Sequence, residues 1–473
     1  MLDMNFNHLT KRLVGLSMAV AVYSATAFAQ LPLTGGQTTT QKTGSAAFSQ
    51  PAANLPLLDQ VDFSVGNSFF RNPWVIAPSS TIARDGLGPL FNTNGCQNCH
   101  IRDGRGHAPM NKDDTATSML VRLSLAALTA EDKRQQLKKG PIAEPRYGHQ
   151  FQDGAVPGVA PEGRIEMAWT TESFRYPDGE KVTLRSSQLS LANLNYGELS
   201  ERVQTSIRIA PQMIGLGLLE QVSEQSILAN ADPDDVDNDG ISGRANFVWN
   251  VRQQQTQLGR FGWKAGMPTL EQQNAAAFNG DLGITSEMFP KDHCTEIQRQ
   301  CLSAPNGDSG AEKELQKDIL TAVTFYTRHL AVPMQRNHDN KEVTQGEVLF
   351  KSTGCAACHT PTMKTPYLAD LPALSEQTFH PFTDLLLHDM GPKLADHREE
   401  FLASGLEWRT PPLWGTGYAL EVNEQVALLH DGRAQSVEEA ILWHGGEAEQ
   451  SRQRFIHLTK QKRDALIAFV NSL

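Results

Sequence analysis

The pentapeptide Cys-x-x-Cys-His occurs twice in the chain, within GCQNCH at residues 95–100 and within GCAACH at residues 354–359. Two thiols at this spacing can add to the two vinyl groups of one porphyrin, and the adjacent histidine can bind the iron as proximal ligand. The histidine disfavours a thioredoxin-like redox pair, and two complete copies of the pentapeptide disfavour half of a zinc site. The motifs therefore predict two covalently bound c-type haems. The predicted residues are Cys96, Cys99 and His100 at the first site and Cys355, Cys358 and His359 at the second.

An internal repeat surrounds the two motifs. Leu90-Phe91 precedes the first motif by the same distance as Leu349-Phe350 precedes the second, and a glycine, Gly95 or Gly354, stands directly before each motif. The repeat predicts a helix before each attachment loop, with its aromatic side chain against the haem edge. The glycine allows the backbone to turn tightly into the loop.

The remaining two cysteines, Cys294 and Cys301, have no metal-binding pattern around them. In an oxidising compartment a local disulfide that closes a small loop is favoured for such a pair. Two free thiols are the alternative.

The first 29 residues have the pattern of a secretory signal peptide. Two basic residues precede the apolar run 13–25, and Ala27-Phe28-Ala29 forms a small-x-small cleavage site. The run is too short to span a bilayer comfortably, so we expect export to the periplasm without stable membrane insertion. The composition of residues 30–55, rich in Thr, Gln, Ser and Gly, predicts a disordered leader.

The formal net charge of the chain is −11 at pH 7. Cleavage of the signal peptide removes one acidic and two basic residues, so the mature chain stays acidic. Nucleic acid is excluded as a partner, because phosphate binding needs a basic surface. An acidic surface is suited to a small basic electron donor.

Hydrophobic patterning divides the mature chain into an N-terminal haem c domain, 56–335, and a C-terminal cytochrome c domain, 336–473. The expected fold class is mainly α, with two cytochrome c-like haem domains and a β-rich insertion in the N-terminal half. Strands are predicted at 119–125, 164–169 and 181–194, and helices at 198–210, 312–330 and 462–473.

The segment DVDNDGISGRAN, residues 235–246, resembles a calcium-binding loop. Carboxylates at alternate positions can converge on one hard cation, while a glycine allows the sharp bend. Asparagine stands where such loops usually have a bidentate glutamate, which argues against helix–loop–helix geometry, and a polar turn is the alternative. The predicted calcium ligands are Asp235, Asp237, Asp239 and the carbonyl of Ile241.

The two motifs, the calcium-like loop, RTPPLWG at 409–415 and LHDGRAQSVEEAI at 429–441 together resemble the bacterial di-haem cytochrome c peroxidase superfamily. Three further phrases resemble its di-haem oxidoreductase family, often labelled thiol-oxidoreductase-like. They are APSSTIARDGLGPLFN at 77–92, DNDGISGRANFVW at 237–249 and TDLLLHDMGPKLAD at 383–396.

The resemblance implies an exported, peroxidase-like oxidoreductase. It implies that the C-terminal haem relays electrons to the N-terminal haem, which reacts with a small oxidant such as hydrogen peroxide. It also implies a tryptophan and a calcium ion between the domains, and Trp249, beside the calcium-like loop, is our candidate for the tryptophan. The implied donor is a small soluble cytochrome or cupredoxin. A non-catalytic electron-transfer cytochrome and an oxidase of a protein partner remain alternatives.

The distal ligands are predicted from the resemblance and from local pattern. The superfamily's axial methionine follows the His-Asp-Gly histidine by fourteen residues, and here that position, counted from His430, is His444. Ser436 and Glu439 predict a capping box for the helix that delivers His444. Met390 and His388 are the alternative ligands. Glu220 is the candidate acid–base group at the first haem.

Overall fold

The computed structural model describes residues 33–112, 114–115, 117–308 and 312–473. The predicted signal peptide, residues 1–29, lies outside these ranges. Within the ranges, no helix is both long and apolar enough to cross a membrane.

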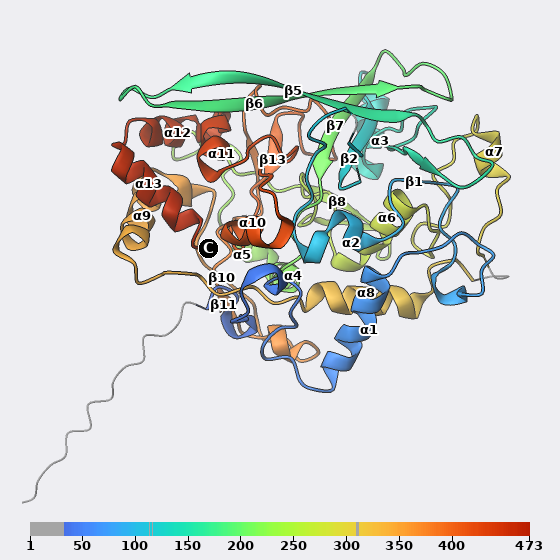
Figure 1. Cartoon of the computed structure of the whole chain (residues 1–473), viewed down its shortest axis with the longest axis horizontal. Coiled ribbons are helices and arrows are strands. Elements are labelled where there is room, and N and C mark those ends of the chain that lie inside the picture. The colour runs from blue at the N-terminus through green and yellow to red at the C-terminus, as the bar shows by residue number, and fades with distance from the viewer. Residues whose placement is uncertain (1–32, 113, 116, 309–311) are drawn as a thin grey trace, which may run out of the picture. The chain divides into compact units, whose positions relative to one another are not determined.

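The described chain contains both helices and strands, in runs of each (Figure 1). The α-helices are α1 (Asp59–Arg71), α2 (Cys96–Cys99), α3 (Ala130–Lys139), α4 (Leu216–Gln221), α5 (Glu224–Leu228), α6 (Leu270–Leu282), α7 (Arg299–Leu302), α8 (Lys317–Arg328), α9 (Lys341–Ser352), α10 (Ala419–Asn423), α11 (Val437–Trp443), α12 (Glu449–Ile456) and α13 (Lys460–Val470). The strands are β1 (Leu90–Phe91), β2 (Met119–Leu125), β3 (Gln150–Phe151), β4 (Gly154–Ala155), β5 (Arg164–Arg175), β6 (Lys181–Ala192), β7 (Val203–Ile209), β8 (Phe247–Asn250), β9 (Gln255–Leu258), β10 (Met363–Lys364), β11 (Thr378–Phe379), β12 (Leu387–Asp389) and β13 (Glu407–Arg409).

The prediction of a mainly α fold with two cytochrome c-like domains is wrong, because the chain builds many small sheets. Helix accounts for 31% and strand for 18%. Within the described ranges, the strands form one three-stranded sheet, β3-β2-β7, and five two-stranded sheets. The strands predicted at 119–125, 164–169 and 181–194 are present as β2, β5 and β6. The fold is therefore a mixture of helices and small antiparallel sheets.

The helix predicted at 198–210 is wrong as well, because its second half forms β7. Every second residue from Val203 to Ile209 is β-branched, and this period of two is typical of a strand. β7 pairs with β2 along the whole length of both strands. The pairing with a distant strand decided the structure of this segment.

β5 and β6 form a long hairpin that extends towards the C-terminal helices (Figure 1). The guanidinium group of Arg463, on α13, is buried and donates to the carboxylates of Asp178 at 2.8 Å and Glu180 at 2.7 Å in the hairpin turn. The hairpin therefore ties the N-terminal half of the chain to its last helix.

Two pairs of helices, α1 with α8 and α9 with α13, pack through a glycine. A Cβ atom on Gly66 would overlap the carbonyl oxygen of Ala322, and one on Gly346 would overlap that of Ala465. Only glycine permits so close an approach of two helix backbones. The two crossings are therefore built in the same way.

One helical turn after each glycine, an aromatic ring packs on the partner helix. The ring centroids of Phe70 and Tyr326 lie 5.3 Å apart, and those of Phe350 and Phe469 lie 5.4 Å apart. The pattern Gly-x-x-x-Phe thus meets Ala-x-x-x-aromatic at both crossings. This repeat is visible in the sequence, but it was not among the predicted features.

The aromatic residue expected beside each motif comes from a helix at both sites, but at the first site it is not Phe91. The ring of Phe350 lies 6.3 Å from that of His359, and the ring of Phe70 lies 6.1 Å from that of His100. Phe91 belongs to β1, which pairs with β4. The segment between the aromatic helix and the motif is much longer at the first site, so the expected register does not apply there.

Residues 33–55, predicted to belong to a disordered leader, pack against the rest of the fold. Ala47 and Phe48 are fully buried in a core cluster that includes Trp414 and Tyr418. The prediction is wrong over this segment. It was based on the polar composition of the whole segment, whereas two apolar residues within it pack in a core formed by residues far along the chain.

The same core cluster joins the two parts of the chain expected as separate domains. It contains Leu218, from 56–335, and Trp414, from 336–473. Pro32–Leu473 form one compact unit. The core therefore extends over both expected domains.

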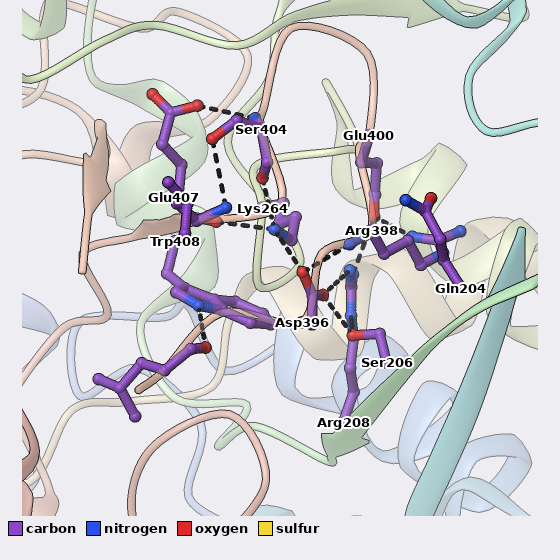
Figure 2. Close-up of polar contacts among 12 residues, drawn as sticks. Gln204, Ser206, Arg208, Lys264, Asp396, Arg398, Glu400, Ser404, Glu407 and Trp408 are labelled. Atoms are coloured by element: carbon purple, nitrogen blue, oxygen red, sulfur yellow. Dashed lines mark hydrogen bonds and ion pairs between the residues drawn. The ribbon is translucent and has the colours of Figure 1, made fainter. Parts of the chain in front are cut away.

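A buried ion pair lies at the centre of a polar network (Figure 2). The ammonium group of Lys264, which is 0% exposed, lies 3.0 Å from a carboxylate oxygen of Asp396. It also donates to the carbonyl oxygens of Ser404, at 2.7 Å, and Glu407, at 2.9 Å. All three donors of Lys264 are therefore satisfied inside the protein.

The network continues from Asp396 to β7. The hydroxyl of Ser206 donates to Asp396 at 2.6 Å. Arg208, also on β7, pairs with Glu400 at 2.9 Å, and Arg398 donates to the same carboxylate at 2.7 Å. These contacts join the three-stranded sheet to the segment 396–407 (Figure 2).

We expect Gly346→Ala to lower the free energy of unfolding by about 1–3 kcal/mol or more, because the added methyl overlaps the Ala465 carbonyl. Chemical denaturation measures the change. The control is Gly280→Ala in α6, where the nearest atom to a Cβ is 3.7 Å away. That variant should be neutral or more stable by about 0.5–1 kcal/mol, and equal effects of the two variants would contradict the crossing.

We expect Lys264→Met to lower the free energy of unfolding by about 3–5 kcal/mol, because it leaves the Asp396 carboxylate buried without the Lys264 cation. The double variant Lys264→Met, Asp396→Leu should recover most of the loss. Lys351→Met is the control, because its ion pair with Glu347 is exposed and contributes at most about 1 kcal/mol. Chemical denaturation of all the variants measures these changes. If the loss of stability in the double variant equalled the sum of the losses in the two single variants, the buried ion pair would be contradicted.

Candidate functional site

The second Cys-x-x-Cys-His motif lies in a cavity at the end of α9. Gly354, in the left-handed region at φ +94°, turns the chain out of the helix and into the motif. Cys355, Cys358 and His359 line the cavity together with His444. The cavity has a volume of about 180 Å³ that a water-sized sphere can reach, and it is partly open to solvent. The structure thus brings one predicted motif and its predicted distal histidine to one space.

The two histidines of this cavity are held in the same way. Nδ1 of His359 lies 2.9 Å from the carbonyl oxygen of Phe382, and Nδ1 of His444 lies 2.6 Å from that of Ala440. A carbonyl can only accept, so Nδ1 carries the proton and Nε2 has a free lone pair. Burial lowers the pKa of His359 to about 4 and also lowers that of His444. Both imidazoles are therefore neutral and can bind a metal.

α11 delivers His444 to the cavity. Ser436 caps the helix by accepting from the backbone N–H of Glu439 at 3.1 Å, and His444 is the C-cap residue. The expected capping box is half formed, because the Glu439 carboxylate accepts from Gln435 and not from Ser436. The local sequence was enough to predict this helix and its end.

Of the alternative ligands, His388 has no free ring nitrogen. Its Nε2 lies 2.7 Å from Asp384 and its Nδ1 lies 2.6 Å from Glu447. Burial opposes protonation, but the two carboxylates raise the pKa of His388 well above its ordinary value. His388 is therefore an imidazolium held between two acids. Met390 lines the cavity, and its thioether could bind a metal.

An aromatic wall forms another side of the cavity. The rings of Trp408 and His430 are stacked, with centroids 3.8 Å apart and an interplanar angle of 11°, and the Lys264 ammonium lies 4.4 Å from the Trp408 ring centroid. Trp263 also lines the cavity, whereas Trp249 belongs to β8 and is not among the lining residues. The tryptophan suggested from the sequence is thus not the one beside this site.

The first Cys-x-x-Cys-His motif is built on the short helix α2. Cys99 is buried, Cys96 is half-buried, and Nδ1 of His100 lies 2.7 Å from the carbonyl oxygen of Pro211. Burial, reinforced by Asp281, raises the pKa of Cys96 to about 12. Burial also lowers the pKa of His100 to about 4. The first site therefore offers two thiols and one neutral imidazole with a free Nε2, as the second site does.

Asp103 is a buried carboxylate beside the first site that the sequence analysis missed. It accepts hydrogen bonds from the hydroxyls of Tyr326, at 2.7 Å, and Ser49, at 2.5 Å. Burial raises the pKa of Asp103 to about 6. Its partners are distant along the chain, so no local pattern could have identified it.

Glu220 lies in α4, and both of its carboxylate oxygens are occupied. One oxygen accepts from the backbone N–H of Leu270 at 2.8 Å, at the start of α6. The other lies 2.7 Å from Arg328 in α8. These contacts join three helices, and they give Glu220 a structural role in place of the predicted acid–base role.

The calcium-like loop brings three carboxylates together. Ligand atoms of Asp232, Asp235 and Asp237 all lie within 4.8 Å of one another. Asp239 is not part of this group, and its side chain accepts from the backbone N–H of Ile241 at 2.8 Å. Asp232, three residues before the expected loop, was missed, and calcium stays a prediction.

The end of the expected loop lies elsewhere. Ile241 lines the second cavity. Asn246 is buried, donates to the carbonyl oxygen of Lys264 at 2.7 Å and accepts from the backbone N–H of Leu402 at 3.0 Å. Asn246 therefore supports the polar network of Figure 2 and takes no part in the acidic cluster.

Cys294 and Cys301 are joined by a disulfide, with their Cα atoms 5.7 Å apart. Within the described residues, the four cysteines of the two motifs are free. The chain thus keeps its cysteines in two classes, one local crosslink and two pairs of buried or half-buried thiols that remain available for attachment.

The comparisons with known proteins agree with the two motifs. No curated protein matches the chain. A solved structure, hydrazine synthase from Kuenenia stuttgartiensis pressurized with 20 bar of xenon, matches at 15% identity over 55% of this chain and 87% of that chain, with a TM-score of 0.23 that is too low to support an argument. A family described as "Di-haem oxidoreductase, putative peroxidase" matches residues 28–473, nearly the whole chain. The chain belongs to this di-haem oxidoreductase family.

Proposed function

We propose that this protein is an exported, periplasmic di-haem c-type oxidoreductase that acts as a peroxidase. Electrons pass from a haem at the C-terminal site to a haem at the N-terminal site, where a small oxidant such as hydrogen peroxide reacts. The observation that supports the proposal most is the shared cavity of Cys355, Cys358, His359 and His444. Membership of the di-haem family supplies the cofactor class.

The residues at the second site suit a relay. Cys355 and Cys358 would hold a haem by two thioethers, and His359 and His444 would bind its iron through their free Nε2 atoms. When bound, the haem supplies an iron centre that gains and loses single electrons. With both histidines bound, the iron would have no position for an oxidant, so this site would transfer electrons without binding the substrate.

The first site is assigned the reaction with oxidant. Cys96, Cys99 and His100 would hold the second haem, with His100 oriented by the Pro211 carbonyl. Reduction of hydrogen peroxide to two waters consumes two electrons and two protons. The electrons come from a small soluble donor, such as a cytochrome or a cupredoxin, and the net charge of −11 suits a basic donor.

Two other functions would use the same cofactors. In a non-catalytic electron-transfer cytochrome, each of the two irons would have two protein ligands and no free coordination position. An oxidase of a protein partner would need an iron with a free coordination position, and it would take its electrons from the partner and not from a soluble donor. The pair His359 and His444 in one cavity suits a relay haem, and the peroxidase is the function that needs a relay beside a second haem that reacts.

The first test is haem content and peroxide turnover. The exported full chain should carry two covalent haems by mass, and Cys99→Ser and Cys358→Ser should each lose one of their two thioether bonds. The parent protein, reduced by a small cytochrome or cupredoxin, should consume hydrogen peroxide. Two low-spin haems in every redox state together with no peroxide turnover would rule out the peroxidase.

The second test concerns His444. We expect His444→Ala to convert the C-terminal haem from low spin to high spin, because an axial ligand is removed. Absorption and electron paramagnetic resonance spectra report the change. His457→Ala is the matched control, because His457 also places Nδ1 near the carbonyl four residues earlier, at 2.8 Å from Gln453, but is exposed. Unchanged spectra in His444→Ala would remove it as a ligand.

A further inference from the structure

Two buried arginines line the second cavity without an acidic partner. Arg105 and Arg409 are each 8% exposed. Arg105 donates to the carbonyl oxygens of Ala427 at 2.9 Å and Leu429 at 3.2 Å. Its bonds are thus to neutral acceptors, and no carboxylate among the described residues pairs with it.

Arg409 is held in a similar way. It donates to the carbonyl oxygens of Gly262, at 2.9 Å, and Thr410, at 3.1 Å. Asp384 is the acid that acts on Arg409, but its carboxylate is already bonded to His388 at 2.7 Å. In the described part of the chain, each of the two guanidinium groups uses Nε and one Nη atom, and the other Nη has no hydrogen-bond partner.

Two unpaired charges in a protein interior are costly. Burial lowers the pKa of Arg105 and that of Arg409 to about 10 each, and desolvation is the main cause for both. A guanidinium remains charged at neutral pH. The carbonyl acceptors, and for Arg105 the Trp263 ring 5.4 Å away, offset part of the cost, and an anion received by the cavity would offset more of it. The third cavity arginine, Arg452, differs because it pairs with Glu449 at 3.0 Å.

The anion must suit a forked donor. A guanidinium group binds a carboxylate with two parallel hydrogen bonds. A haem attached at Cys355 and Cys358 would bring two propionate carboxylates to this cavity. Two arginines without an acidic partner and two propionates match in number and in charge.

We infer that Arg105 and Arg409 bind the two propionates of the haem at the C-terminal site. The inference rests on the proposed function, because it requires a haem on Cys355 and Cys358. Arg105 lies five residues after His100, so a loop of the first site supplies a counter-ion to the second. The backbone N–H of Arg105 donates to Asn423 at 3.2 Å, which fixes the loop in this position.

The test uses the exported full chain with its haems and the variants Arg105→Gln and Arg409→Gln. Midpoint potentials of both haems are measured by spectroelectrochemical titration, with the C-terminal haem identified by its response to His444→Ala. A nearby cation favours the reduced iron, so each variant should lower the reduction equilibrium constant of that haem at least tenfold, which is 59 mV for a one-electron couple. The other haem should change less than threefold.

Charge-conserving variants separate binding from folding. Arg105→Lys and Arg409→Lys should restore most of the lost potential. Arg185→Gln is the control, because Arg185 is also buried and donates to the carbonyl oxygens of Arg433 and Gly432, but does not line the cavity. It should leave both potentials within threefold of the parent.

Two results would overturn the inference. The first is a parent-like potential in both Gln variants when two haems are present. The second is a Lys variant that shifts, or loses its haem, as much as the Gln variant, because the role is then structural. A parent protein without a C-terminal haem would instead overturn the proposed function, and haem content by mass distinguishes that case before any potential is measured.

Discussion

The buried pair of Lys264 and Asp396 is the interaction on which the arrangement around the second cavity depends. It joins the loop after β9, the strand β7 and the segment that leads into β13. The ammonium group also lies against the face of Trp408, whose other neighbour is the stacked ring of His430. Because the Lys264 ammonium group and the His430 imidazole both pack against the indole, the Trp408 side chain has little freedom to move. The polar network therefore sets the position of an aromatic cavity wall, and it does so at a high desolvation cost that only complete pairing offsets.

The sequence predicted those features that depend on spacing within a short segment. The strands β2, β5 and β6 follow from alternation, and the helix before His444 follows from Ser436 and the glycines after it. What could not be predicted depends on partners far along the chain. β7 is a strand because β2 pairs with it, and the segment 33–55 is ordered because Phe48 enters a distant core. The mainly α class was wrong for the same reason, because the strands between β1 and β13 pair with partners that the two short motifs do not indicate.

The candidate site shows the same division. The motif cysteines and His444 could be found because each has a fixed offset from a neighbour. Arg105 could not, because its acceptors Ala427 and Leu429 are more than three hundred residues away. Glu220 was chosen because it lies in an apolar helix, but the pattern of that helix does not show that Arg328 occupies its carboxylate. Local sequence thus identifies groups that can react or bind, and the fold decides which of them are left free.

The two motif sites are built in a similar way, but their surroundings differ. Each has a glycine-mediated helix crossing and an aromatic ring near the motif histidine, so a common scaffold orients both imidazoles. The second cavity then takes walls from the other half of the chain, through Trp263 and the loop that follows His100. The loop that carries Arg105 begins at His100 of the first motif, so the backbone connects the second cavity to the first motif. Under the proposed transfer of single electrons between two haems, such a connection would couple the two sites, because the loop that would help to fix one potential is continuous with the backbone that holds the other motif histidine.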